Sequence, residues 1–116
     1  MSVLSDYNVA FFFHLQIGGR CISSVNDWMS QFIGDHYRVD TINSVITNVN
    51  NVLNGNVDNW IGENLGMQIA YVELNETKIF KDADEWFDNQ NVVPDFILPT
   101  SHFKIILESW RDYLQG

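Results

Sequence analysis

The chain has 116 residues, of which 46% are hydrophobic and 18% charged, and its fifteen acidic and six basic side chains give a net charge of −9. This length suits one domain with one modest core, and the apolar content excludes intrinsic disorder. No apolar run is long enough to predict a membrane-spanning helix, and the first residues lack the pattern of a secretory signal. Cys21 is the single cysteine, which excludes an intrachain disulfide. Together these features predict a soluble cytoplasmic protein.

The negative charge is concentrated in one third of the chain. Residues 58–95 hold nine acids and two bases, a net charge of −7, whereas the other 78 residues carry −2. Such a segment repels nucleic acids and anionic membranes. It attracts basic proteins and speeds their association at low salt. The alternative interpretation is that the acidity only keeps the protein soluble.

The first half of the chain predicts one strand and two helices. Apolar residues alternate over 9–17, which predicts a strand ended by two glycines. A helix is predicted from an N-cap at Ser24 to a C-cap at Gly34, and 36–39 is a short extended candidate. A second helix is predicted over 40–54. Its polar face consists of poor helix formers, so packing of its apolar stripe must stabilise it.

The second half predicts a small sheet and a final helix. Residues 55–66 are rich in Gly, Asn and Asp, which predicts an ordered loop or a short helical turn. Residues 67–74 are apolar on both faces, as in a central strand, and 77–81 pairs back on them as a hairpin. Residues 92–98 are extended around a proline, which suits a sheet edge. A helix with one apolar face follows from Pro99.

Helices and strands therefore mix without strict alternation. This pattern predicts an α+β fold, in which a small antiparallel or mixed sheet packs against about three amphipathic helices. We expect a single domain over residues 1–116.

The sequence contains no recognisable catalytic or metal-binding motif. Cys21 follows Gly-Gly-Arg on a predicted connection, without the surroundings of a nucleophile. From Asp82 onward the chain superficially resembles a calcium loop, but Phe87 and Val93 stand where an EF-hand needs Gly and Glu. The histidines fall on separate predicted elements without zinc-ligand spacing: His14, His36 and His102. We therefore predict no enzyme activity, no metal and no cofactor.

Two adjacent aromatic residues, Trp86 and Phe87, stand among carboxylates in the acidic segment. Core packing is the ordinary role of at least one of them. Two consecutive aromatics rarely both point inward, so we expect the other to be exposed, as the anchor of an interface is. Trp60 has the same two interpretations.

The C-terminal residues 96–114 run from a short apolar strand through Pro-Thr-Ser into a helix with the pattern Phe-x-x-x-Leu-x-x-Trp-x-x-Tyr-Leu. The pattern falls on Phe103, Leu107, Trp110, Tyr113 and Leu114. This segment resembles the ending of many bacterial immunity proteins. The small size, the acidity and the lone cysteine also resemble immunity proteins of polymorphic toxin and contact-dependent growth inhibition systems.

This resemblance implies a cytoplasmic protein that binds and neutralises a cognate toxin domain, often a nuclease acting on tRNA or DNA. Nuclease toxins carry basic clefts for phosphates, and carboxylates can pair with the same Lys and Arg side chains. We expect a basic toxin domain as the partner, and no direct contact with nucleic acid or membrane. The expected toxin-binding residues are six carboxylates and one aromatic anchor: Glu73, Glu76, Asp82, Asp84, Glu85, Asp88 and Trp86.

Other functions stay open at this point. An acidic nucleic-acid mimic that inhibits a host nuclease would share the charge. A general protein-interaction adaptor would share the exposed aromatic, and a small enzyme is the third alternative.

Overall fold

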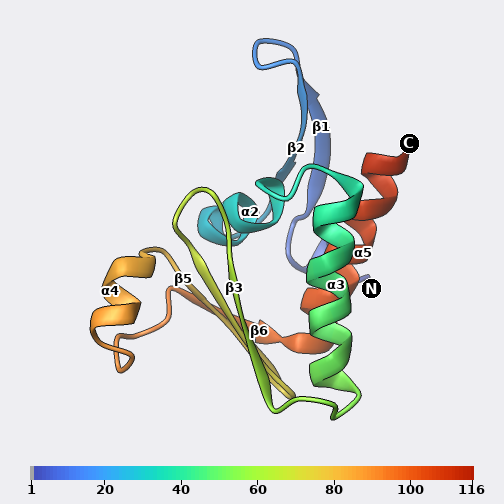
Figure 1. The fold of residues 1–116 in the computed structure, drawn as a ribbon. Coiled ribbons are helices and arrows are strands. Elements are labelled where there is room, and N and C mark those ends of the chain that lie inside the picture. Colours follow the sequence, from blue (N-terminus) through green and yellow to red (C-terminus); the bar gives the residue numbers. More distant parts are fainter. Residues whose placement is uncertain (1) are drawn as a thin grey trace.

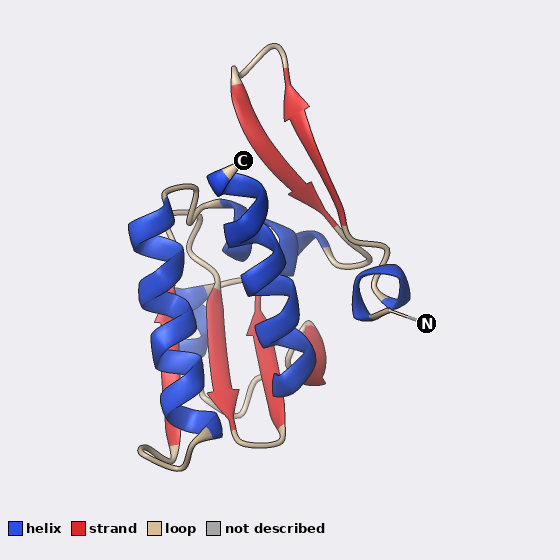
Figure 2. Ribbon diagram, turned by 90° about the vertical axis from the view of Figure 1, so that its right-hand side faces the viewer, coloured by secondary structure: helices blue, strands red, loops and turns tan. Residues whose placement is uncertain are grey.

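In a computed structural model, which describes residues 2–116, an antiparallel sheet of four strands carries two long helices on one of its faces (Figure 1). The two helices lie side by side across the sheet (Figure 2). The strands follow one another in space in chain order, and the predicted α+β class is confirmed. The elements of this layer are β3 (Asn59–Glu63), β4 (Ile69–Glu73), β5 (Glu76–Phe80), β6 (Phe96–Pro99), α3 (Val39–Leu53) and α5 (Thr100–Gln115).

The remaining elements surround this layer. A separate two-stranded antiparallel hairpin projects away from the body of the molecule (Figures 1 and 2). Helix α2 lies near the base of the hairpin. Helix α4 lies at one end of the four-stranded sheet, on the face away from α3 and α5 (Figure 1). These elements are α1 (Val3–Asp6), β1 (Ala10–His14), β2 (Gly19–Ser23), α2 (Asp27–Gly34) and α4 (Ala83–Asp88).

The main hydrophobic core lies between the sheet and the helices. Because side chains alternate along a strand, Ala70 and Val72 of β4 point to this side and are fully buried. The predicted apolar stripe of α3 is confirmed as buried. Trp110 of α5 is also fully buried, and its indole N–H donates to the His36 carbonyl oxygen over 2.9 Å. The largest other members of this core are Phe32, Phe103, Met29, Ile33, Ile42, Ile79 and Leu98.

The start of α3 differs slightly from the prediction. The helix begins at Val39, and residues 36–38 form no strand. No side chain caps the helix N-terminus; the Thr41 hydroxyl instead donates to the Arg38 carbonyl oxygen over 2.9 Å. The first predicted helix, which is α2, is capped by Asn26 and not by Ser24, since the Asn26 side chain accepts the Met29 N–H.

The predicted strand over residues 9–17 is too long. It ends at His14, and the chain turns back through Leu15–Gly18 into β2. Gly18 has a φ of +66° and its N–H donates to the His14 carbonyl oxygen over 2.8 Å, which closes the turn. Cys21 therefore lies on a strand, and the expectation that it lies on a connection is wrong.

The loop predicted over residues 55–66 contains strand β3. Asn59, Gly62 and Glu63 are of types depleted in strands, but pairing with β4 overrides this, with Trp60 opposite Val72. A side chain at Gly62 would meet the Trp60 ring at 2.5 Å, so the missing Cβ lets Trp60 lie over the strand.

The hairpin of β4 and β5 is confirmed, whereas the extended segment predicted over 92–98 forms a strand only from Phe96, so Pro94 lies before it. β4 and β5 are the two inner strands and form a hairpin, and β6 is an edge strand with Pro99 at its end. Within residues 2–116, no helix has both the length and the apolar character that crossing a membrane requires.

A buried hydroxyl pair joins the sheet to the start of α5. The Thr100 hydroxyl donates to the Glu73 carbonyl oxygen over 2.5 Å, so its one proton is used there. Thr77 must then be the donor in its 2.9 Å contact with Thr100. Both side chains are fully buried.

Thr100→Val should therefore cost more than Thr77→Val. The first change leaves a buried donor on Thr77 and an acceptor on Glu73 without their partner, which we expect to lower the free energy of unfolding by about 1–3 kcal/mol. The second change removes only a donor and should cost less than about 1 kcal/mol. Urea unfolding of both variants measures the difference. An equal or reversed order would contradict this donor assignment.

Candidate functional site

The face of the four-stranded sheet that points away from α3 and α5 is only partly covered. The strand register places Ile61, Tyr71, Lys78 and Ile97 in one row across all four strands. Each neighbours residues that point into the main core, so the row lies on the opposite face. Ile61 and Ile97 are exposed, and Tyr71 is half-buried. We call this surface the open sheet face.

Helix α4 covers one end of the open sheet face. The Asp82 carboxylate caps the helix by accepting the Glu85 N–H over 3.2 Å, and the Ala83 N–H donates to the Met67 carbonyl oxygen over 2.8 Å. These contacts fix the helix start. The helix then turns Trp86 onto the strands below it.

Trp86 is not the exposed anchor that the sequence analysis expected. It is only 3% exposed and packs with Ile69, Phe80 and Ala83 in a second, smaller core. Its ring centre lies 5.9 Å from that of Tyr71. The reason is helical spacing: Ala83 and Trp86 are three residues apart, so they share the face that packs on the sheet.

Phe87 is the exposed aromatic residue of the pair. It is 52% exposed, and its ring meets that of Trp86 edge to face, with the centres 5.1 Å apart. Tyr71, Trp86 and Phe87 therefore form a continuous aromatic path from the open sheet face to the outside of α4.

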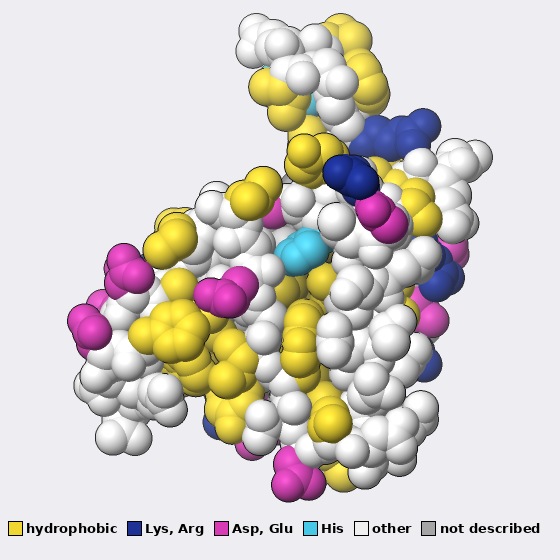
Figure 3. All heavy atoms as spheres, viewed as in Figure 1, with side chains coloured by type: hydrophobic (Ala, Val, Ile, Leu, Met, Phe, Trp, Pro, Cys, Tyr) yellow, Lys and Arg dark blue, Asp and Glu magenta, His cyan; other side chains and the backbone are white. Residues whose placement is uncertain are grey.

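The six predicted carboxylates fall into two groups on either side of the apolar row. Glu73 and Glu76 lie side by side at the β4–β5 turn. The others lie at α4, which follows the opposite end of β5, about 13 Å away for a strand of this length. This second group consists of Asp82, Asp84, Glu85 and Asp88. Figure 3 shows hydrophobic side chains gathered over α4 and the adjoining strands, with acidic side chains at their margin.

Two of the six carboxylates are engaged within the chain. Asp82 caps α4. Glu73 forms an ion pair with Lys78, with 3.2 Å between Lys78 Nζ and Glu73 Oε1. The hydrogen bond to Glu73 raises the pKa of Lys78, although partial burial acts against this. In the part of the chain that the structure describes, no hydrogen bond or ion pair engages the other four side chains: Glu76, Asp84, Glu85 and Asp88.

The apolar centre of this surface is not evident from the sequence. The sequence predicts a loop at Ile61 and predicts Tyr71 and Ile97 only as strand residues. The alternation within 67–74 shows that Tyr71 faces away from Val72. It cannot show that this second face stays partly uncovered, because that depends on where α4 packs.

The histidines and Cys21 lie apart from the open sheet face. His36 Nδ1 lies 2.8 Å from the Phe32 carbonyl oxygen, and His102 Nδ1 lies 2.8 Å from the Tyr7 hydroxyl. Burial, with the nearby Asp6 charge, raises the pKa of Tyr7. Among residues 2–116, the structure has no group of three or more His, Cys, Asp or Glu side chains that could hold a metal ion.

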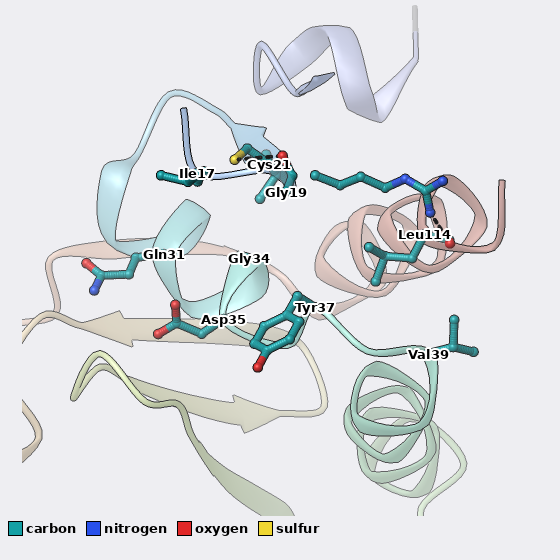
Figure 4. Close-up of a pocket in the computed structure, with 11 residues that line it drawn as sticks. Ile17, Gly19, Cys21, Gln31, Gly34, Asp35, Tyr37, Val39 and Leu114 are labelled. Carbon is teal, nitrogen blue, oxygen red and sulfur yellow. Dashed lines mark hydrogen bonds between the residues drawn. The ribbon is translucent and has the colours of Figure 1, made fainter. Parts of the chain in front are cut away.

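A cleft of about 460 Å³ lies between the hairpin, α2 and the C-terminal end of α5 (Figure 4). Arg20 crosses it and donates to the Leu114 carbonyl oxygen. The Asp35 carboxylate at its rim already accepts from the Asn64 amide over 2.8 Å and from the Gly66 N–H over 2.7 Å. The cleft is therefore mainly an apolar recess beside the hairpin, lined by Ile17, Ile22, Val39 and Leu114.

Comparison of the chain with protein-family models, with curated proteins and with solved structures finds no match.

The different positions of Trp86 and Phe87 predict different effects of the same substitution. Trp86→Ala should lower the free energy of unfolding by about 3–5 kcal/mol, because it empties the small core under α4. Phe87→Ala should change it by less than about 0.5 kcal/mol. Urea unfolding of the two variants tests this, and a large loss for Phe87→Ala would contradict the placement of its ring.

Proposed function

We propose that the chain is an inhibitor of the immunity type, which binds a basic toxin domain in the cytoplasm through the open sheet face and α4. The observation that carries this proposal is the layout of the surface. An apolar centre lies between two groups of carboxylates, most of which have no partner in the described chain.

This layout fits a protein partner. Interfaces between proteins have an apolar centre with aromatic residues and a polar rim that excludes water from it. Ile61, Ile97 and Phe87 supply exposed apolar area. Tyr71 lies beside Ile61 and reaches Phe87 through Trp86, whereas Lys78 lies between Tyr71 and Ile97. A surface that only mimicked nucleic acid would need carboxylates at the spacing of phosphates and no such centre. The apolar centre therefore favours an inhibitor over a mimic.

The charge selects a basic partner. Carboxylates such as Asp84, Glu85 and Asp88 can each receive hydrogen bonds from Arg or Lys, as phosphate oxygens do. Domains that cleave nucleic acids carry such basic surfaces. The inhibitor need not react with the toxin. It prevents the nucleic-acid substrate from binding if it covers the toxin's phosphate-binding site or a surface beside that site.

A growth assay tests this function directly. The product of the open reading frame immediately upstream is expressed in cells with and without this chain. We expect that product to arrest growth and the chain to restore it. An upstream product that is harmless, or whose toxicity the chain leaves unchanged, counts against the proposal.

The charge of the surface predicts the binding behaviour of the purified pair. The Kd should rise steeply with salt, because screening weakens the attraction. Asp84→Lys/Glu85→Lys should weaken binding by roughly tenfold to a hundredfold at low salt and flatten the salt dependence. Asp82 is left unchanged because it caps α4.

A matched control reverses two exposed acids elsewhere, Asp6→Lys/Asp112→Lys, and changes the net charge equally. It should weaken binding much less than the α4 variant does. Equal losses would show that net charge alone attracts the partner, and they would remove the open sheet face from the proposal. Phe87→Ala supplies an uncharged test, with an expected loss of about tenfold or more.

A further inference from the structure

The distal half of the β1–β2 hairpin exposes a group of large apolar side chains. Phe12, Phe13, Leu15 and Ile17 are 41%, 54%, 86% and 70% exposed. We call these four residues the hairpin tip. Figures 1 and 2 show that this part of the chain stands clear of the helices and of the main sheet.

The fold stabilises only the base of this hairpin. Phe11 stacks on Tyr113 of α5, with the ring centres 5.2 Å apart, and also contacts Trp110. Ile22, which is opposite Phe11, is buried. Beyond this pair, within residues 2–116, no third strand lies beside the two strands, and Arg20 reaches α5 through the Leu114 carbonyl oxygen and the Tyr113 ring. An isolated two-stranded ribbon is marginal in water, and free strand edges with exposed apolar side chains favour association.

The charge of the hairpin indicates what kind of protein covers it. No acidic residue occurs between Asp6 and Asp27, and the segment contains the cation Arg20. Its guanidinium lies over the Tyr113 ring, 5.6 Å from the centre. The hairpin has no carboxylate that could pair with the Lys and Arg side chains of a basic partner. It also has no carboxylate that would repel an acidic protein. With a net charge of −9, the chain itself is such a protein, and the acid-free hairpin is a projecting surface (Figure 1) where two copies can approach with less repulsion than at the acidic α4.

We propose that the hairpin tip is a homodimer contact, which buries the apolar side chains of one copy against those of a second. The tip offers on the order of 450 Å² of apolar surface per copy in total, although the consecutive strand residues Phe12 and Phe13 point to opposite faces of the ribbon. The adjoining apolar cleft, which Ile17 lines, enlarges this surface (Figure 4). A standard interface buries about 800 Å² per partner. The contact is therefore smaller than a standard interface, which is typical of weak, transient association, and we expect a dimer that dissociates on dilution.

Sedimentation and light scattering of the purified full chain test this proposal without any partner, so the result is independent of the proposed function. The buffer contains a reductant, which prevents Cys21 from linking two copies. We expect the mass to rise from 13.4 kDa toward twice that value with increasing concentration. Added salt should strengthen the dimer, because it screens the repulsion between two acidic copies. This is the opposite of the salt effect on binding a basic toxin.

Matched variants locate the contact. Phe13→Ser and Phe87→Ser remove the same side chain at nearly equal exposure, 54% and 52%, from two different surfaces. Phe13→Ser should raise the dimer Kd at least tenfold, and Phe87→Ser should leave it unchanged. Leu15→Ser, at the most exposed position of the tip, provides a second hairpin variant that the folded monomer tolerates, and it should also weaken the dimer.

A mass that stays at 13.4 kDa up to about 0.5 mM would overturn the proposal. A dimer that persists in both hairpin variants, or that Phe87→Ser disrupts, would also overturn it. Loss of toxin binding in the hairpin variants of a strictly monomeric chain would assign the tip to the toxin instead.

Discussion

The burial of β4 on both of its faces is the constraint on which the two halves of this structure depend. Ala70 and Val72 pack into the core under α3 and α5, whereas Ile69 and Tyr71 face the opposite side, where α4 and Trp86 lie. Burial on two faces makes the register of this strand unambiguous, because a slip of one residue would exchange the two sets. β3 and β5 pair with β4 on either side, so they inherit its register. The composition of the open sheet face is therefore fixed by the same packing that forms the core.

Much of this fold follows from local sequence patterns. The stripe along residues 40–54, the two-faced apolar run from Met67 to Leu74 and the apolar face of the last helix each carry a strong period, and each corresponds to an element of the structure. β3 could not be predicted in this way. Three of its five residues, Asn59, Gly62 and Glu63, are of types depleted in strands, and pairing with the edge of β4 is what makes the segment extended. The hairpin at 10–23 is a related case. The alternation of apolar residues continues through Leu15 and Ile17, although these two residues lie in the turn and not in a strand.

The candidate site was predictable in its charge and not in its shape. The sequence shows an excess of acidic residues over 58–95. It does not show that Glu73 and Asp88 lie at opposite ends of β5 and are therefore far apart in space. The choice between Trp86 and Phe87 needed the phase of a helix of six residues, which is too short to show a period. Once α4 begins at the Asp82 cap, the phase is set, and the ring that turns inward is Trp86. The two hydrogen bonds that fix the start of α4, at Asp82 and at Ala83, thus determine which aromatic residue is exposed.

The distribution of charge separates two kinds of surface on one small molecule. Carboxylates border the open sheet face and α4, and the hairpin carries none. In a strongly acidic chain, an apolar surface without acids is the part that another acidic protein can approach, whereas an apolar surface bordered by acids favours a basic one. The hairpin and α4 project from the body in different directions (Figure 1). The two proposed associations therefore use surfaces that point apart, and we expect higher ionic strength to weaken toxin binding and to strengthen the dimer.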